Sequence, residues 1–251
     1  MNALRRAIGI FGEILVTLGV IVLLFGAYEL WGTGVYTAQQ QTDLRSRLEQ
    51  SWAAATAVPP PPTTATSGGP SPTTGQTPGQ SPVPTKAPVF DITQVPIGSG
   101  LAILRIPLFG ADYQKVVVQG VGVEDLKRGP GHYPGSAFPG DVGNFVVSGH
   151  RTTYGAPFNR IDELHAGDPI VVQTATDWFV YRVTSEEVVD PSALDVITPV
   201  PHHPDEKATA AVMTLTTCNP KYSASQRLIV YAALDQKLPI SAGRPDVLAK
   251  G

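Results

Sequence analysis

The sequence predicts an all-β domain at the C-terminal end of a chain that begins with one transmembrane helix. Three features of the 251 residues support this: a long apolar segment near the N-terminus, a Pro-rich segment after it, and short runs rich in Val, Ile, Tyr and Thr beyond. The predicted divisions are a cytoplasmic N-terminus and anchor at 1–36, a juxtamembrane stalk at 37–58, a disordered linker at 59–88 and a folded domain at 89–251.

The apolar segment runs from Ala7 to Tyr28, and its only charged residue is Glu13. At ~1.5 Å per residue, about 20 residues cross a bilayer core of ~30 Å, so the segment is long enough to span a membrane. Arg5 and Arg6 precede it, which predicts a cytoplasmic N-terminus and an extracellular C-terminal domain. A cleaved signal peptide is the alternative, but its apolar part is usually only ~7 to 15 residues long. We therefore expect a single-pass protein of the cell membrane.

The stalk and the linker differ in composition. Residues 37–58 are polar and compatible with a helix, with Leu44 and Leu48 four residues apart. From Pro59 to Pro88 the chain consists mainly of Pro, Thr, Ser and Gly. Such a segment cannot bury enough apolar surface to offset its ordering entropy, so we expect an extended, unfolded linker.

The remaining part, about 160 residues, suits one domain with a sizeable core. Helical signals are confined to Val123–Arg128 and Pro157–Leu164. Frequent Pro and Gly with few helices favour a compact β-barrel or sandwich over alternating strand–helix units. The formal net charge of -3, without a basic run beyond the first residues, indicates no nucleic-acid partner. The candidate strands are 101–106, 115–119, 144–149, 169–174, 177–189, 209–218 and 226–234.

Cys218 is the only cysteine, and it ends an apolar run that begins near Ala208. Outside the membrane a lone cysteine cannot form an internal disulfide, so it is either a buried apolar residue or a thiol kept for its reactivity. A thiol with an ordinary pKa of ~8.5 is only a few per cent thiolate at neutral pH. A reactive Cys218 therefore needs a partner.

His150 and Arg227 are the candidate partners of Cys218. His150 follows an apolar strand, 144–147, whereas the other four histidines lie in segments marked by Gly or Pro. Strands that end at His and at Cys would hold a rigid catalytic pair. Arg227 begins the next apolar run, and on an antiparallel neighbour it could favour the thiolate or hold an oxyanion. An ordinary loop histidine and a strand-edge arginine paired with a carboxylate are the alternatives.

Three segments resemble the Cys, Arg and His signatures of the sortase family. They are Thr214-Leu215-Thr216-Thr217-Cys218, Arg227 with the apolar residues after it, and Asn144-Phe145-Val146-Val147-Ser148-Gly149-His150-Arg151. A further phrase, 129–136, resembles one that precedes the His strand in the class E and class D branches. The resemblance covers the region after the linker. It points to class E, the LAXTG-type housekeeping sortases of high-GC Gram-positive bacteria.

The resemblance implies a closed, eight-stranded sortase-type β-barrel with a few short helices, and a cysteine transpeptidase. Some members of the family use calcium, but the sequence shows no converging set of oxygen ligands, so we expect no cofactor or metal. In this family a cysteine cleaves the Thr–Gly bond of an LPXTG-type sorting signal, and an amine resolves the thioacyl-enzyme. Carried over, Cys218 is the nucleophile, His150 the general acid and base, and Arg227 the group that positions substrate and stabilises the oxyanion. The implied partners are secreted proteins with LAXTG- or LPXTG-like signals and a lipid-linked peptidoglycan precursor that supplies the amine.

The resemblance also makes Tyr133, Ser148 and Thr217 candidates for the substrate groove. A bulky Tyr133 at the pocket for the second signal residue would disfavour Pro and suit Ala. The alternative is that Tyr133 packs under the barrel rim. His132, next to it, could hydrogen-bond a loop and never meet substrate.

Other classes fit the residues less well. An L,D-transpeptidase expects Ser-His-Gly-Cys, but Cys218 follows Thr-Thr, and papain-like wall amidases place Cys before His in the chain. Within the family the alternative is a class C or class D enzyme for pilin polymerisation or specialised substrates; class C would usually add a second membrane helix and a lid. A non-catalytic envelope β-domain also stays open. A metal site is a weak hypothesis, because His202 and His203 have no other ligand at suitable spacing.

Overall fold

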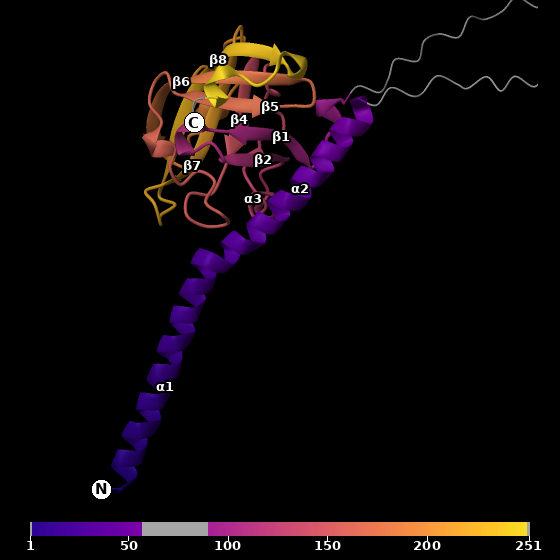
Figure 1. Ribbon diagram of the computed structural model, residues 1–251. Coiled ribbons are helices and arrows are strands. Elements are labelled where there is room, and N and C mark those ends of the chain that lie inside the picture. The colour runs from indigo at the N-terminus through magenta and orange to yellow at the C-terminus, as the bar shows by residue number, and fades with distance from the viewer. Residues whose placement is uncertain (1, 57–89, 250–251) are drawn as a thin grey trace, which may run out of the picture.

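The structure, a computed structural model, describes residues 2–56 and 90–249. The predicted linker, 59–88, lies outside the described residues, so its character stays a prediction. A long N-terminal helix leads to one side of a β-barrel, as Figure 1 shows.

The strands close into a barrel in the order β1-β2-β3-β4-β7-β8-β6-β5, which confirms the predicted eight-stranded barrel. The pairs β2–β3 and β4–β7 are parallel, and the others are antiparallel. The predicted strands correspond to all of these except β3, which is too short to show an alternating pattern. The strands are β1 (Gly100–Arg105), β2 (Gln114–Gln119), β3 (Gly131–His132), β4 (Gly143–Ser148), β5 (Pro169–Gln173), β6 (Asp177–Val189), β7 (Ala211–Asn219) and β8 (Gln226–Pro239).

Alternation along the strands separates the barrel interior from its outer face. Phe145 and Val147 of β4 and Leu215 of β7 are fully buried in the main core cluster. Because successive side chains point to opposite faces, Ser148 and Thr216 lie on the outer face, and both are partly exposed. The outer face over β4, β7 and β8 is therefore where reactive side chains can meet a substrate.

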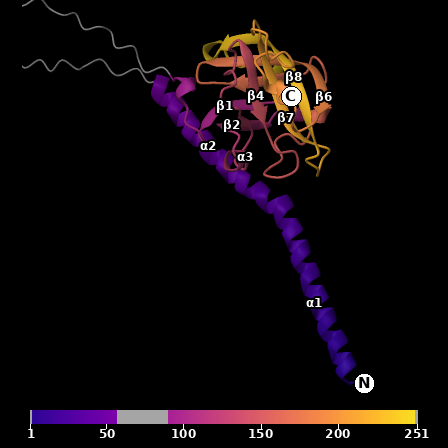
Figure 2. The ribbon, with the colours of Figure 1, turned by 180° about the vertical axis from the view of Figure 1, so that it is seen from behind.

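The helices lie outside the barrel. Helix α1 (Asn2–Ala27) contains a stretch, Arg5–Ala27, that is long and apolar enough to cross a membrane, in agreement with the predicted span. A π-helical turn, Tyr28–Gly32, joins it to α2 (Thr33–Thr56), and α3 (Val123–Leu126) is a single turn. Both views show α2 running alongside β1 and β2 (Figures 1 and 2).

Helix α2 packs on the barrel through one stripe of residues. Leu44, Leu48 and Trp52 form a second core cluster with residues of β1 and β2. One turn earlier, the Gln41 amide accepts a hydrogen bond from the Val116 N–H at 2.7 Å and donates to the Val116 carbonyl at 3.0 Å. The amide thus pairs with the backbone of β2 as a neighbouring strand would.

The predicted helix at Pro157–Leu164 is wrong. The structure has turns there and a 3-10 helix at Ile161–Glu163. Phe158, Ile161 and Leu164 are all fully buried. Their spacing of three residues matches the three residues per turn of a 3-10 helix, so local packing favours that geometry over an α-helix.

Candidate active site

The ends of β7 and β8 bring Cys218 and Arg227 together. The antiparallel register pairs Cys218 directly with Arg227, as the sequence predicts. Directly opposed residues project from the same face of a sheet, with Cα atoms about 4.5–5.5 Å apart. Both side chains are partly exposed, so the thiol and the guanidinium share the accessible outer face.

His150 reaches the same place from β4. The parallel register of β4 and β7 pairs Ser148 with Thr216, and the Gly149 N–H continues the pairing by donating to the Thr216 carbonyl at 3.0 Å. The strand thus leads His150, two residues beyond Ser148, toward the end of β7 that carries Cys218, two residues beyond Thr216. A Cβ at Gly149 would come within 2.6 Å of the Phe158 ring, so only glycine fits between the strand and His150.

Arg151 fastens the residues after His150 to the end of β7. Its guanidinium donates to the Cys218 carbonyl at 3.3 Å and to Asn219 Oδ1 at 3.0 Å, and it forms an ion pair with Asp162 at 3.1 Å. Only 4% of the side chain is exposed. A buried charge requires such partners, so Arg151 fixes His150 relative to Cys218. The sequence showed Arg151 only as part of a motif; nothing in the spacing gave its partners.

The electrostatic setting differs between His150 and Arg227. Burial lowers the pKa of His150, which favours a neutral imidazole. Its ring packs on that of Tyr154 with centroids 5.0 Å apart at an interplanar angle of 38°. Arg227 Nη1 donates to the carbonyls of Ala224 and Gln226 at 3.0 and 2.9 Å, which holds its charge at the β7–β8 turn.

A groove lies at the other end of β4, near its first residues. A cavity of about 460 Å³ lies between the β3–β4 connection and the β6–β7 segment, residues 190–210. Its volume is in the range of ligand sites. The lining residues include Tyr133, Ser136, Val142, Asn144, Ile197 and Pro199.

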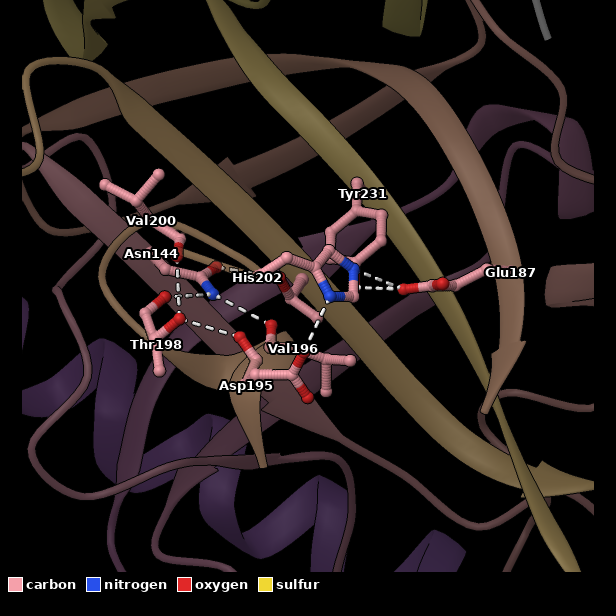
Figure 3. A network of polar contacts seen from close by, with 9 residues as sticks. Asn144, Glu187, Asp195, Val196, Thr198, Val200, His202 and Tyr231 are labelled. Atoms are coloured by element: carbon pink, nitrogen blue, oxygen red, sulfur yellow. Dashed lines mark hydrogen bonds and ion pairs between the residues drawn. The ribbon is translucent and has the colours of Figure 1, made fainter. Parts of the chain in front are cut away.

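Two polar clusters fasten the β6–β7 segment, one wall of this groove, to the barrel (Figure 3). Asn144, which is 1% exposed, donates to the carbonyls of Val196 and Thr198 and accepts from Thr214 Oγ1 at 2.8 Å. Further out, His202 lies between Asp195 and Glu187, with ring nitrogens 2.8 and 2.7 Å from their carboxylates.

The His202 cluster is ionic. The hydrogen bond with Asp195, and then that with Glu187, raises the pKa of His202, and His202 in turn holds the pKa of Asp195 below its usual range. The Tyr231 hydroxyl donates to Glu187 at 2.6 Å. A protonated imidazole donates to both carboxylates, so the charged form of His202 fastens the segment best.

The predicted substrate residues occupy different positions. Tyr133 lines the groove, and Ser148 lies on the outer face at the end of β4. Thr217 points into the barrel with 3% exposure, and its hydroxyl donates to the Gly149 carbonyl at 2.7 Å. Thr217 therefore ties β7 to the segment that carries His150, and its contact with substrate stays a prediction.

The remaining histidines are engaged elsewhere. His132 is fully buried, with Nδ1 2.6 Å from Gln119 Oε1 and Nε2 3.0 Å from the Ala137 carbonyl, so it hydrogen-bonds a loop as the sequence suggested. His203 lies 3.3 Å from Glu206. Within residues 2–56 and 90–249 no group of three or more His, Cys, Asp or Glu side chains could hold a metal ion.

Comparison with known proteins identifies what this arrangement resembles. The family model described as sortase domain matches residues 104–235. The chain is 35% identical over 245 residues to "Sortase SrtE1" of Streptomyces coelicolor, a match that covers 94% of this chain and 60% of that protein's length. The structure of sortase E from Streptomyces avermitilis matches with 41% identity and a TM-score of 0.56, covering 61% of this chain and 99% of that one. Sortase E1 from Streptomyces coelicolor with a tripeptide in the active site matches with 38% identity and a TM-score of 0.56, covering 60% and 97%.

Proposed function

Because the chain belongs to the sortase family, we propose that it is a membrane-anchored cysteine transpeptidase. It cleaves an LAXTG- or LPXTG-type sorting signal between Thr and Gly and transfers the new carboxyl end to a cell-wall amine. The observation that carries this proposal is the register that pairs Cys218 with Arg227 on one accessible face of the barrel. The parallel pairing of β4 with β7, which leads His150 toward the same end of β7, supports it.

In the first step, neutral His150 takes the proton of the Cys218 thiol and Sγ attacks the Thr carbonyl carbon. The C–N bond to glycine breaks, His150 returns the proton to the leaving amine, and a thioester remains on Cys218. In the second step an incoming amine attacks the thioester, His150 takes its proton, and the thiolate leaves. The lowered pKa of His150 suits the part of base at the start of each step.

Arg227 is proposed to position the Thr carbonyl and stabilise the negative charge that develops on its oxygen. Its register opposite Cys218 supports this role, because both side chains occupy the same outer face. The guanidinium keeps its charge at any working pH and presents several donors in a fixed plane. Charge stabilisation of this kind is often the largest single contribution to acyl transfer.

Tyr133, Ser148 and Thr217 are proposed to shape the groove for the signal. Tyr133 lines the cavity between the β3–β4 connection and the β6–β7 segment, where a bulky ring would disfavour Pro and suit Ala at the second signal position. Ser148 lies on the outer face between that cavity and Cys218. Thr217 is proposed to act indirectly, because its hydroxyl holds the Gly149 carbonyl next to Ser148. We therefore expect a preference for LAXTG over LPXTG signals, as in class E.

The chain is proposed to lie in the cell membrane with a cytoplasmic N-terminus and an extracellular catalytic domain at 89–251, preceded by the anchor, stalk and linker at the predicted boundaries. The apolar helix α1 and the two arginines at the start of its span support this topology. The proposed partners are secreted proteins with LAXTG- or LPXTG-like signals and a lipid-linked peptidoglycan precursor as acceptor. No cofactor enters the proposed reaction.

The test is incubation of the full chain in detergent with LAXTG and LPXTG peptides, followed by intact mass spectrometry. We expect a thioacyl adduct on Cys218 that is absent in Cys218→Ala, and more adduct with LAXTG. If neither peptide is cleaved or attached, the proposal is wrong. Tyr133→Ala should reduce the preference for Ala over Pro several-fold, as loss of one steric contact in a pocket does. An unchanged preference in this variant would remove Tyr133 from the specificity site.

A further inference from the structure

The segment after His150 adopts an unfavourable backbone conformation. Three consecutive residues, Tyr154, Gly155 and Ala156, have φ angles of 50°, 70° and 41°. Non-glycine residues rarely occupy this left-handed region, and they persist there only where the surroundings hold them. Two such residues within six positions of His150 indicate a segment whose shape is imposed by its contacts.

One of these contacts comes from the membrane-proximal end of α2. The Tyr154 N–H donates to Thr33 Oγ1 at 3.3 Å, while the Thr33 hydroxyl donates to the Glu29 carbonyl at 2.7 Å. A Cβ added at Gly155 would lie 3.4 Å from Thr37 Cγ2, so the two segments run close together here. Thr33 and Thr37 are each only 4% exposed. One face of the first turns of α2, at Thr33 and Thr37, is therefore buried where the helix passes this segment.

Tyr154 connects this contact to the imidazole. Within residues 2–56 and 90–249, the His150 ring nitrogens have no hydrogen-bond partner, so no carboxylate or carbonyl there orients the ring. The Tyr154 ring packs on the imidazole, with centroids 5.0 Å apart. A shift of the Tyr154 ring would therefore change the packing that orients the imidazole.

The same contact lies close to the membrane anchor. Thr33 is six residues beyond Ala27, the last residue of the apolar stretch, which corresponds to ~9 Å at ~1.5 Å per residue. Both views show α1 leaving α2 at the end of the barrel where its long loops lie (Figures 1 and 2). The first part of α2 therefore reaches the His150 segment directly from the anchor.

We propose that Thr33 and Tyr154 are positioning residues that couple the membrane anchor to His150. Thr33 holds the backbone of Tyr154, and the Tyr154 ring holds the imidazole in the orientation needed to exchange protons with Cys218 and the substrate amine. This inference rests on the proposed transpeptidase function. It adds that the anchor helix is part of the structure that makes His150 competent, as well as a tether.

The experiment uses the full chain in nanodiscs, an LAXTG peptide, and two readouts: kcat and KM for cleavage, and the pH profile of Cys218 alkylation by iodoacetamide. Tyr154→Asn removes the ring while keeping a residue that tolerates a positive φ, so folding should be retained. We expect kcat to fall about tenfold with KM unchanged, and the alkylation profile to shift, because a misplaced general acid acts poorly. Tyr154→Phe keeps the ring and should behave as wild type.

Thr33→Val removes the hydrogen-bond acceptor with little change of shape, and Thr42→Val on the exposed side of α2 is its matched control. We expect about a threefold loss of kcat in Thr33→Val and none in the control. The inference is overturned if folded Tyr154→Asn keeps the wild-type kcat and alkylation profile, or if Thr33→Val and Thr42→Val behave alike. A wild-type chain that forms no adduct at all would instead overturn the proposed function, and this inference with it.

Discussion

The two ends of β4 are fastened to the rest of the molecule by different chemistry. At the end that leads to His150, Arg151 is buried and contacts the Cys218 carbonyl, and Thr217 holds Gly149 from inside the barrel. At the other end, the β6–β7 segment is held partly by His202, whose side chain is 41% exposed and whose partners are carboxylates. The proposed reacting groups thus rest on contacts shielded from solvent, whereas the groove wall is held by the buried Asn144 and, in addition, by an exposed contact that titrates.

This contrast separates two requirements of acyl transfer. The nucleophile and the general acid must stay in place to within a fraction of an ångström, and buried contacts supply that precision. A wall of the groove has to admit an extended peptide, and a partly exposed ionic contact opens at lower cost. Substitutions that act on one end of β4 only can test whether the two requirements are separate.

The largest effect is expected from Arg151→Met at the His150 end. Loss of the guanidinium leaves the Cys218 carbonyl without its buried donor, which we expect to lower the free energy of unfolding by about 2 kcal/mol. Because His150 is then less well fixed, kcat for peptide cleavage should fall more than tenfold. Urea unfolding and cleavage kinetics measure the two effects.

Arg160→Met is the matched control for Arg151→Met. Arg160 pairs with Glu163 nearby in the chain, but its side chain is 44% exposed. An exposed ion pair of this kind contributes little, so both unfolding and kcat should stay close to wild type. Equal effects of the two substitutions would mean that burial of Arg151 is irrelevant and would remove one side of the comparison.

A smaller effect, of a different kind, is expected from Asn144→Leu at the other end of β4. The leucine has a similar size but leaves the carbonyls of Val196 and Thr198 and the hydroxyl of Thr214 unpaired, so the free energy of unfolding should fall by at least about 1 kcal/mol. The β6–β7 segment should exchange its amide hydrogens faster. We expect KM for the peptide to rise several-fold with kcat little changed, because the groove wall moves and the reacting groups do not. A fall in kcat with constant KM would show that the two ends are not independent.

The sequence alone predicts those parts of this architecture whose pattern lies within one short stretch of residues. The long strands alternate or carry continuous apolar runs, so they were predicted, and Cys218 and Arg227 follow from the strand ends on which they lie. The role of Arg151 could not be predicted, because its partners, Asp162 and the Cys218 carbonyl, come from other parts of the chain. Contacts between segments that are far apart in the sequence produce no spacing pattern within it.

The position of α2 was missed for a different reason. Its barrel-facing stripe runs through the helix at spacings of three and four residues, but only its second half, at Leu44, Leu48 and Trp52, is apolar. The first half consists of Thr33, Thr37 and Gln41, whose polar groups bond to barrel carbonyls and amides. A hydropathy pattern cannot distinguish such residues from a solvated face, so the predicted stalk gave no sign of a packed helix.

The smallest expected effect concerns His202 and depends on pH. The carboxylates of Asp195 and Glu187 raise its pKa, so the contact is fully formed below the ordinary pKa of about 6.5 and is lost as pH rises through the raised value. Asp195 has a lowered pKa, so the stabilisation that its carboxylate contributes to the contact is lost only as pH falls below about 4.

His202 has a φ of 66°, which asparagine tolerates, so His202→Asn removes the imidazole without backbone conflict. We expect amide exchange of residues 190–210 to be about two- to threefold faster in this variant at about pH 5.5 and unchanged at about pH 9. His203→Asn, which alters a neighbouring exposed histidine, should differ from wild type at neither pH. If amide exchange in His202→Asn is faster than in wild type by the same factor at both pH values, His202 acts by packing. The contacts that hold the groove wall would then be as independent of pH as the contacts of Arg151 and Thr217 at the other end of β4.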